Sequence, residues 1–437
     1  MAEPSTPLDS TESSPKIDNP YLSNKTRNYA LGLLTVGYCF NFIDRQLLSI
    51  LQEAIKVDLG LSDGQLGLLT GFAFAMFYVS AGIPIARWAD KGNRRNIVAY
   101  AIGIWSFMTA ISGLAQNYLQ LFLARIGVGI GEAGGSPPSH SIISDIFPPE
   151  KRATAISIYS TGVNIGILFG FLFGGWLNEF FGWRVAFAVV GAPGIVIALV
   201  IRYTLKEPIR GLSEGRVVNT AVAPLGDVLG LLWSRRSFRH MAIAAGLNAF
   251  AAYGTVNWQA SFFIRSHEMG TGELGTWLAL SSGLLGAIGI LGGGIIADKL
   301  APRDKRWVPA IVGFIGVPFF ITVFLTESKY TALILSCIPG LLINVYLGNS
   351  IATAHALVGA RMRAMASAIL FFILNLIGLG MGPSAVGFLS DYLEPTYGVE
   401  SLRYAMVFLI PAALFWSSCH FMLATRTLRE DLANAPD

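Results

Sequence analysis

Long apolar stretches dominate the chain and recur at intervals that fit membrane-spanning helices. Six lie in residues 28–52, 62–88, 95–115, 118–145, 152–180 and 183–204, and six more in residues 241–265, 272–299, 308–326, 330–358, 362–390 and 402–425. Each has about 20 residues or more, which suffices for a helix that crosses a hydrocarbon core of about 30 Å. The pattern predicts an all-α membrane protein with twelve transmembrane helices.

Polar segments divide these stretches into two sets of six. We expect residues 1–27 to be a disordered tail, residues 28–205 and 241–427 to be six-helix bundles, residues 206–240 to be a linker and residues 428–437 to be a second tail. The linker is rich in charge, and within it the segment from Pro224 to Trp233 has the pattern of an amphipathic helix on a membrane surface.

Composition excludes most other classes of protein. Of the 437 residues, 53% are hydrophobic and 13% are charged, whereas a soluble domain carries about 25% charged residues. So few charges cannot cover a globular surface, which excludes a soluble enzyme, a disordered chain and a disulfide scaffold. The five histidines and three cysteines show no metal-ligand spacing, and no Walker-type phosphate loop is present. We expect no metal, no organic cofactor and no nucleic-acid partner.

The distribution of charge predicts the orientation in the membrane. If the N-terminus is cytoplasmic, 24 of the 31 Lys and Arg residues fall in cytoplasmic segments and five on the opposite side. Cytoplasmic loops of membrane proteins carry an excess of these residues. We therefore expect both termini to be cytoplasmic.

Two pairs of matching segments indicate an internal duplication. Asp90 follows the second span as Asp298 follows the eighth, 208 positions later, and Arg152 opens the fifth span as Arg363 opens the eleventh, 211 positions later. Two independent signals with nearly the same offset predict two similar halves in the same orientation, related by an axis along the membrane normal.

Motifs in the first half carry a resemblance to a known family. The segment from Asp90 to Arg95 resembles the acidic-then-basic loop signature of the major facilitator superfamily, with Ala86 where that family usually has glycine. Span 4 contains Arg125-x-x-x-Gly129-x-Gly131-Glu132-Ala133, which is similar to the superfamily's arginine motif. The resemblance implies two pseudo-symmetric six-helix bundles that expose a central site to either side of the membrane in turn.

The same resemblance assigns roles to loop charges and glycines. It implies a cytoplasmic gate formed by Asp90, Arg94, Arg95 and Asp298, in which Asp90 faces the amino end of span 11, where negative charge is favoured. Span 5 has small residues at four-residue spacing, which allow close helix packing and which the family uses between its halves. These are Gly162, Gly166, Gly170, Gly174 and Gly175.

Within the superfamily, the Spinster family is the most similar. Asn41-Phe-Ile-Asp44-Arg45 in span 1, together with Gly131-Glu132-Ala133, looks like the pattern of this family, whose animal members are associated with export of sphingosine-1-phosphate and lysophospholipids. The resemblance implies a monomeric protein of the bacterial inner membrane, surrounded by membrane lipids. An Asp-Arg pair in span 1 also looks like the organic-anion symporters of the superfamily.

Four charged residues are clear cases of charge within a predicted span, and all are in the first half: Asp44, Arg45, Arg125 and Glu132. Charge within a membrane is costly unless it is paired or hydrated, so such residues are functional candidates. Our hypothesis is that Glu132 and Asp44 bind the coupled proton, that Arg45 is the ion-pair partner that exchanges, and that Arg125 binds an anionic substrate through its planar fork. The alternative is a static network that only fixes helix packing.

Polar and aromatic residues near the middle of the spans are candidates for the cavity lining. They are Tyr78, Tyr159, Thr161, Asn164, Asn248, Tyr253, Asn257, Asn344, Asn349, Phe371, Phe372 and Asn375. The corresponding spans of the second half have no such charged cluster, and this half suits an apolar tail. We therefore expect a proton-coupled transporter of amphiphilic anionic lipids, and not an enzyme. A proton symporter of small organic anions and, more remotely, an intramembrane lipid-modifying enzyme are the alternatives.

Overall fold

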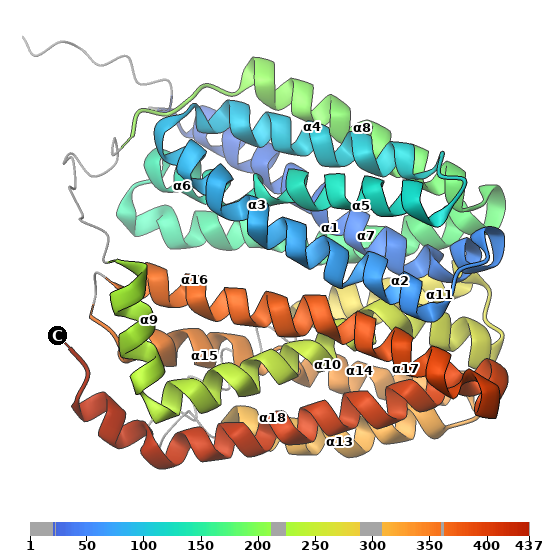
Figure 1. Ribbon diagram of the computed structural model, residues 1–437. Coiled ribbons are helices and arrows are strands. Elements are labelled where there is room, and N and C mark those ends of the chain that lie inside the picture. Colours follow the sequence, from blue (N-terminus) through green and yellow to red (C-terminus); the bar gives the residue numbers. More distant parts are fainter. Residues whose placement is uncertain (1–20, 22, 211–223, 289–307, 360–361, 437) are drawn as a thin grey trace, which may run out of the picture.

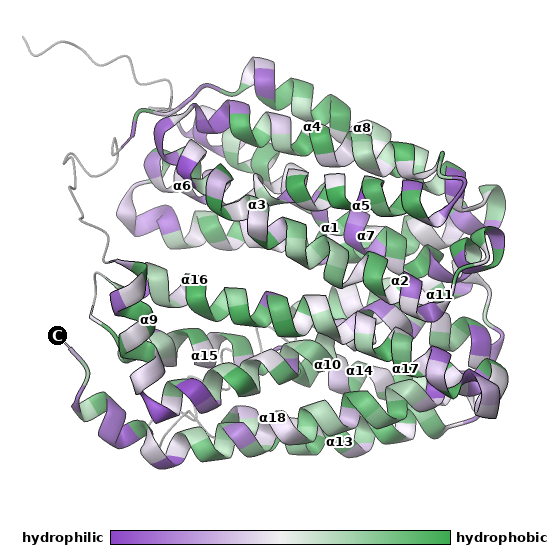
Figure 2. Ribbon diagram, viewed as in Figure 1, coloured by the Kyte–Doolittle hydropathy of each residue, from purple (hydrophilic) through white to green (hydrophobic). Residues whose placement is uncertain are grey.

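The computed structural model describes residues 21, 23–210, 224–288, 308–359 and 362–436. Within these residues the regular structure is helical, as the apolar pattern predicts. The helices form two bundles that lie side by side (Figure 1). Hydrophobic residues occupy the middle of the helices and hydrophilic residues gather at the two ends of the bundles (Figure 2). By length and composition, six described helical segments are able to cross a membrane, and one of them, Met365–Ala433, covers the last two predicted spans.

The N-terminal bundle contains eight helices because two predicted spans are interrupted at glycine. Its helices are α1 Asn24–Leu59, α2 Asp63–Thr70, α3 Phe72–Lys91, α4 Arg94–Ser112, α5 Tyr118–Ala133, α6 Ser136–Ile146, α7 Pro149–Phe181 and α8 Trp183–Thr204. Gly71 separates α2 from α3, and Gly134 and Gly135 separate α5 from α6. Gly71 has φ −105° and ψ −93°, outside the helical region, whereas at Gly134 and Gly135 the absence of a Cβ allows close approach to Ala101 and Trp105 of α4.

The C-terminal bundle follows a short linker helix, α9 Leu225–Ser234. Its helices are α10 Arg236–His267, α11 Thr271–Leu278, η1 Ala279–Leu285, α13 Val308–Leu325, α14 Lys329–Leu342, α15 Val345–Ala356, α16 Arg363–Ile373, η5 Leu374–Met381, α17 Gly382–Tyr397, η6 Gly398–Glu400 and α18 Ser401–Ala433. The segments η1 and η5 are π-helices that continue α11 and α16, whereas η6 is a 3₁₀ turn. Asp298, the second copy of the loop aspartate, lies outside the described residues.

We distinguish two ends of the molecule. The linker end contains α9, the start of α1 and the end of α18, and the far end contains the turns at Gly60, Gly182 and Gly398 (Figure 1). All three glycines have positive φ, a conformation that a residue with a Cβ adopts at a cost. The halves meet through contacts of α2 with α17, of α7 with α11 and η1, of α1 with α10, and of α3 with η5.

The glycine stripe of span 5 packs closely, but against a different partner from the one expected. A Cβ at Gly162, Gly166 or Gly170 would collide with the backbone of α1, which belongs to the same half. Gly175 is the glycine of α7 that meets the other half, where Gly275 of α11 lies against it. The periodicity therefore predicted a close helix contact correctly, while the interface assigned to it was wrong for most of the stripe. A stripe of small residues fits any closely approaching helix equally well.

Candidate functional site

The four charged residues of the predicted spans meet in one buried cluster, which we call the charged cluster. Arg45 of α1 donates from Nε to Oε2 of Glu132 on α5 at 2.8 Å, and its Nη2 lies 2.7 Å from the same oxygen. Arg125 of α5 donates from Nη1 to Oδ2 of Asp44 on α1 at 2.9 Å. Thr109 of α4 donates to Oδ1 of Asp44 at 2.6 Å. Two acids and two bases from two helices thus neutralise one another.

Burial makes the partners in this cluster depend on one another. The side chains of Glu132, Asp44 and Arg125 are 0%, 3% and 3% exposed, whereas that of Arg45 is 17% exposed. An ionised group at such depth is stabilised by its partner, and removal of one member typically costs about 3–5 kcal/mol. Oε1 of Glu132 and Nε of Arg125 are buried and have no hydrogen-bond partner in the described part of the protein. The cluster is therefore neutral but not saturated.

Aromatic rings hold the two arginines in place. The guanidinium of Arg45 lies 4.9 Å from the ring centre of Phe74, 5.1 Å from that of Phe42 and 5.4 Å from that of Tyr78. The guanidinium of Arg125 lies 5.7 Å from the ring of Phe74. Contacts between cations and ring faces are attractive, and more so where water is absent. Phe74 thus contacts both arginines.

A cavity between the two halves opens onto the charged cluster, and we call it the head cavity. It has an empty volume of about 460 Å³. Its lining comes from α1, α2, α3, α5, α10 and η5: Phe42, Arg45, Gln46, Leu48, Thr70, Phe74, Arg125, Tyr253, Val256, Asn257 and Leu379. Of these lining residues, four were predicted from the sequence, namely Arg45, Arg125, Tyr253 and Asn257, and the others were not. Gln46 was detectable as a polar residue in an apolar span, but Phe74 has no feature that separates it from ordinary packing.

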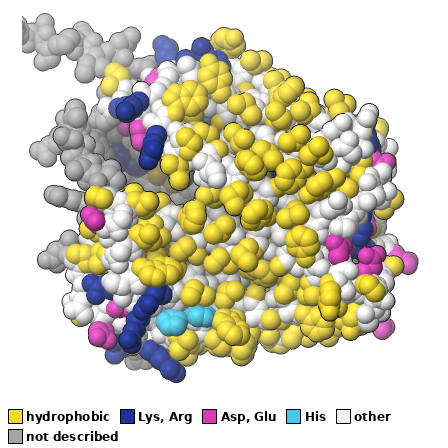
Figure 3. Space-filling model, in the orientation of Figure 1, with side chains coloured by type: hydrophobic (Ala, Val, Ile, Leu, Met, Phe, Trp, Pro, Cys, Tyr) yellow, Lys and Arg dark blue, Asp and Glu magenta, His cyan; other side chains and the backbone are white. Residues whose placement is uncertain are grey.

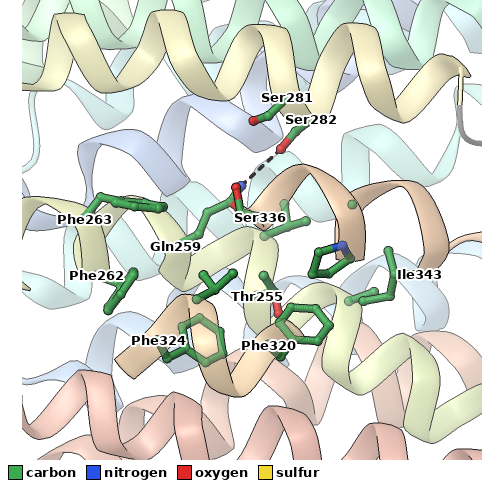
Figure 4. Close-up of a pocket in the computed structure, with 15 residues that line it drawn as sticks. Thr255, Gln259, Phe262, Phe263, Ser281, Ser282, Phe320, Phe324, Ser336 and Ile343 are labelled. Atoms are coloured by element: carbon green, nitrogen blue, oxygen red, sulfur yellow. Dashed lines mark hydrogen bonds between the residues drawn. The ribbon is translucent and has the colours of Figure 1, made fainter. Parts of the chain in front are cut away.

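A second cavity lies inside the C-terminal bundle, and we call it the apolar cavity (Figure 4). It has an empty volume of about 590 Å³, and its lining includes Phe262, Phe263, Phe320 and Phe324. Val256 of α10 lines both cavities, so they adjoin at this residue. The polar groups here are neutral. Gln259 donates to Ser282 at 3.4 Å, and Oγ1 of Thr255 is buried without a hydrogen-bond partner among the described residues.

The other residues selected as cavity lining have varied surroundings. Tyr78 contacts Arg45, and Tyr159 is buried and stacked on Tyr38 with ring centres 4.4 Å apart. Thr161, Asn344, Phe371 and Phe372 are exposed, Asn164 and Asn375 are half-buried, and Asn248 and Asn349 line two smaller cavities within the C-terminal bundle. The structure thus brings Tyr78 next to the charged cluster and leaves most of the others outside the head cavity.

A second ionic group, which the sequence analysis did not identify, joins the halves at the far end. Arg265 of α10 donates from Nη1 and Nη2 to the two carboxylate oxygens of Asp63, each at 2.7 Å, and from Nε to Glu53 of α1 at 2.7 Å. Lys56 donates to Asp63 at 2.7 Å. The side chains of Arg265 and Asp63 are 8% and 2% exposed. We call this group the far-end lock.

A carboxylate of the C-terminal half completes the far-end lock. Asp391 of α17 accepts hydrogen bonds at 2.8 Å from the backbone N–H groups of Asp63 and Gly64, the first two residues of α2. Ser390 donates to Asp63 at 2.6 Å. The first N–H groups of a helix have no partner within the helix, and a negative charge is favoured there. The start of α2 is therefore stabilised by the opposite half.

The predicted gate residues lie at the linker end and make contacts within the first half and the linker. The buried Arg94 donates to Glu207 at 2.8 Å and also pairs with Asp145. The backbone N–H of Arg95 donates to Glu207 at 2.8 Å. Asp90 is exposed, and within the described residues it forms no ion pair with the C-terminal half. Hydrogen bonds and ion pairs that cross between the described parts of the halves lie towards the far end.

Comparison with known proteins decides the family. Residues 34–383 match the sequence model described as "Major Facilitator Superfamily". The chain belongs to this superfamily. The predicted fold, two bundles of membrane helices, is therefore confirmed, and the protein is a transporter rather than an enzyme.

Relatives narrow the similarity within the superfamily. An "MFS-type efflux pump" of Mycolicibacterium smegmatis is 32% identical over 92% of this chain and 94% of its own. The solved structure of a bacterial homologue of the human lysosomal transporter Spinster, inward-facing and occupied, is 33% identical with a TM-score of 0.81, covering 94% of this chain and 99% of that one. A sphingosine-1-phosphate transporter, SPNS2 of Danio rerio, is 24% identical over 93% of this chain and 86% of its own. The resemblance to the Spinster family is confirmed.

Proposed function

We propose that this transporter carries amphiphilic anionic lipids, of the lysophospholipid or sphingosine-1-phosphate kind, and couples their movement to protons. The observation that carries the proposal is that a cavity lined by two arginines adjoins a largely apolar cavity at Val256. A molecule with an anionic head and an apolar tail matches both environments at once. A small organic anion uses only the first of them.

The arginines supply the site for the head. Arg45 is the more exposed, and Arg125 lines the same cavity with an unpaired Nε. Guanidinium groups bind phosphate and carboxylate through two parallel hydrogen bonds. An anion that binds Arg45 competes with Glu132 for it, so substrate binding weakens the pair that keeps Glu132 ionised.

Proton coupling follows from that competition. A carboxylate that is fully buried and loses its partner is destabilised by several kcal/mol, and it recovers stability by taking up a proton. Anion binding at Arg45 and protonation of Glu132 therefore favour each other. Asp44 is the second candidate, but it retains Arg125 and Thr109 as partners while Arg45 exchanges.

The apolar cavity supplies the site for the tail. Burial of apolar surface contributes about 0.8 kcal/mol for each CH₂ group that leaves water. A tail of eight such groups thus gains about 6 kcal/mol, which a short anion lacks. This term distinguishes lipids from small organic anions as substrates.

The arrangement of the halves supports alternating access. Contacts between the halves lie towards the far end, so a path to the head cavity is expected from the linker end. The excess of Lys and Arg in segments of the linker end supports placing that end, with both termini, in the cytoplasm of a bacterial inner membrane. We propose that closure of the linker end brings Asp90 to the start of α16, with Arg94 and Arg95 beside it, and that a monomer surrounded by lipid performs the cycle.

The test is transport of labelled lysophospholipid into proteoliposomes with an imposed pH gradient. We expect flux that depends on the gradient in the natural protein. Phe320→Ala, in the apolar cavity, should slow lipid flux, whereas Phe314→Ala, on the exposed side of the same helix, should not. Flux of a small carboxylate without lipid flux, in folded protein, would replace lipids with small organic anions as the substrate class.

A further inference from the structure

Two histidines meet on the outer face of the C-terminal bundle, away from both transport cavities. Nδ1 of His240 on α10 lies 3.0 Å from Nδ1 of His420 on α18. Both side chains are half-buried. Figure 3 shows two neighbouring histidine side chains at the surface, with Lys and Arg side chains on one side and hydrophobic side chains on the other. Ser417 of α18 donates to the carbonyl of Ala244 at 2.7 Å and fixes the two helices beside the pair.

The pair lies close to the linker end of its two helices, where we expect lipid head groups to meet acyl chains. His240 is four residues from Arg236, where α10 begins, and a helix rises 1.5 Å per residue, which gives about 6 Å. His420 lies about 9 Å from Arg426 on the same scale. Farther into the membrane the surface is apolar, since Trp416 is 59% exposed and its ring stacks beside His420 at 6.5 Å.

Three cationic residues lie within six positions of the pair along the same two helices. Arg236 and Arg239 lie on the first turn of α10, and Arg426 lies on α18. In the described part of the chain none of these three forms an ion pair. On α18, the carboxylate of Asp431 accepts a hydrogen bond at 2.8 Å from the backbone N–H of Ser237.

The chemistry of the pair favours an anion over a metal ion. When two neutral imidazoles share a hydrogen bond between Nδ1 atoms, the ring that accepts carries its hydrogen on Nε2 and can donate it elsewhere. Two nitrogens alone make an incomplete metal site, and no group of three metal-ligating side chains occurs among the described residues. The neighbouring arginines repel a cation and attract a phosphate.

We propose that His240, His420 and Arg239 bind the head-group phosphate of an anionic phospholipid from the surrounding bilayer. The acyl chains would lie along the exposed apolar surface of α18 beyond Trp416. Basic pockets between transmembrane helices are suited to anionic head groups. The site is separate from the charged cluster and does not depend on the nature of the transported substrate.

Native mass spectrometry of the detergent-solubilised protein, incubated with equal amounts of phosphatidylglycerol and phosphatidylcholine, tests the proposal. We expect preferential retention of phosphatidylglycerol, reduced about tenfold in the double variant His240→Gln, His420→Gln and in Arg239→Gln. The single variant leaves the contact between α10 and α18 intact, so it remains informative if the double variant does not fold. Arg202→Gln, at the same end of the other half, is the matched control and should leave retention unchanged.

Three results would overturn the proposal. One is equal retention of the two lipids by the natural protein. Another is an equal loss of phosphatidylglycerol in Arg202→Gln, which would indicate a general effect of positive charge. The third is binding of added Zn²⁺ that depends on the two histidines and displaces phosphatidylglycerol, which would make the pair a metal site.

Discussion

Replacing Arg265 with Gln should open the transporter at the far end. The natural side chain makes three hydrogen bonds to Asp63 and Glu53. Gln keeps much of the volume but leaves Glu53 without its cation, and it leaves the buried Asp63, which is 2% exposed, with Lys56 as its one remaining cationic partner among the described residues. Removal of one partner from a buried ion pair costs about 3–5 kcal/mol. Because water reaches the carboxylates once the halves part, this cost falls on the state that is closed at the far end.

The size of the shift follows from that difference. A penalty of about 3 kcal/mol on one state changes the ratio of the two states about 100-fold, since each 1.4 kcal/mol is a factor of ten. If about one molecule in 100 of the natural protein is open at the far end, the substitution should make the two states about equally populated. The substitution therefore acts on the conformational equilibrium, with the charged cluster left intact.

Distances between spin labels measure this equilibrium directly. We would place the labels at Val57 and Val399, which are 79% and 68% exposed at the far end of the two halves, after replacing the three native cysteines. Arg265→Gln should add a population with a longer distance. Arg184→Gln is the control, because its pair with Asp58 lies at the same end, is about 40% exposed and stays within the first half. An unchanged distance distribution in folded Arg265→Gln would refute the reasoning that the lock holds the far end closed.

Three further predictions concern coupling, tail binding and packing. Glu132→Gln should lower stability, since Arg45 loses its partner, and in folded protein it should remove the dependence of lipid flux on the pH gradient. Glu430→Gln at the exposed end of α18 should keep that dependence, and coupling that survives in Glu132→Gln would exclude this carboxylate. Phe320→Ala should lose more activity with long-chain than with short-chain lysophospholipids, measured as the ratio of the two fluxes, and a ratio equal to that of the natural protein would place the tail elsewhere. Gly166→Val should lower the thermal midpoint, because its side chain collides with the backbone of α1; the free energy of unfolding should fall by about 1–3 kcal/mol or more. Gly32→Ala, where a Cβ meets open space, should leave the midpoint unchanged. Equal midpoints for Gly166→Val and the natural protein would show that α1 and α7 can move apart without cost.

The charged cluster was predictable because charge within an apolar stretch stands out. Asp44, Arg45, Arg125 and Glu132 interrupt apolar spans, where charge is costly. Arg125 and Glu132 are seven positions apart, which places them on one face of a helix. The role of Arg45 as an ion-pair partner was part of the hypothesis, and the structure pairs it with Glu132. The pairing of Arg125 with Asp44 was not predicted, because it depends on the rotation of α1 against α5, which the sequence pattern does not contain.

The far-end lock was not predicted, for a different reason. Arg265 and Asp63 lie at the ends of predicted spans, where charged residues are ordinarily solvated, and only the approach of α2 to α17 buries them. The apolar cavity was hidden because Phe320 and Phe324 resemble packing residues. The breaks in spans 2 and 4 were not predicted: they lie at glycines, but glycine is so frequent in this chain that its presence alone does not mark a break.

The capping of α2 by Asp391 turns two backbone amides into natural reporters. While the halves are together at the far end, the N–H groups of Asp63 and Gly64 are held by a carboxylate of the opposite half and are protected from solvent. When the halves part, the same hydrogens lose their acceptor and become free to exchange with deuterium. The rate at which these two amides exchange in the unlabelled protein therefore reports how often the far end opens during the transport cycle.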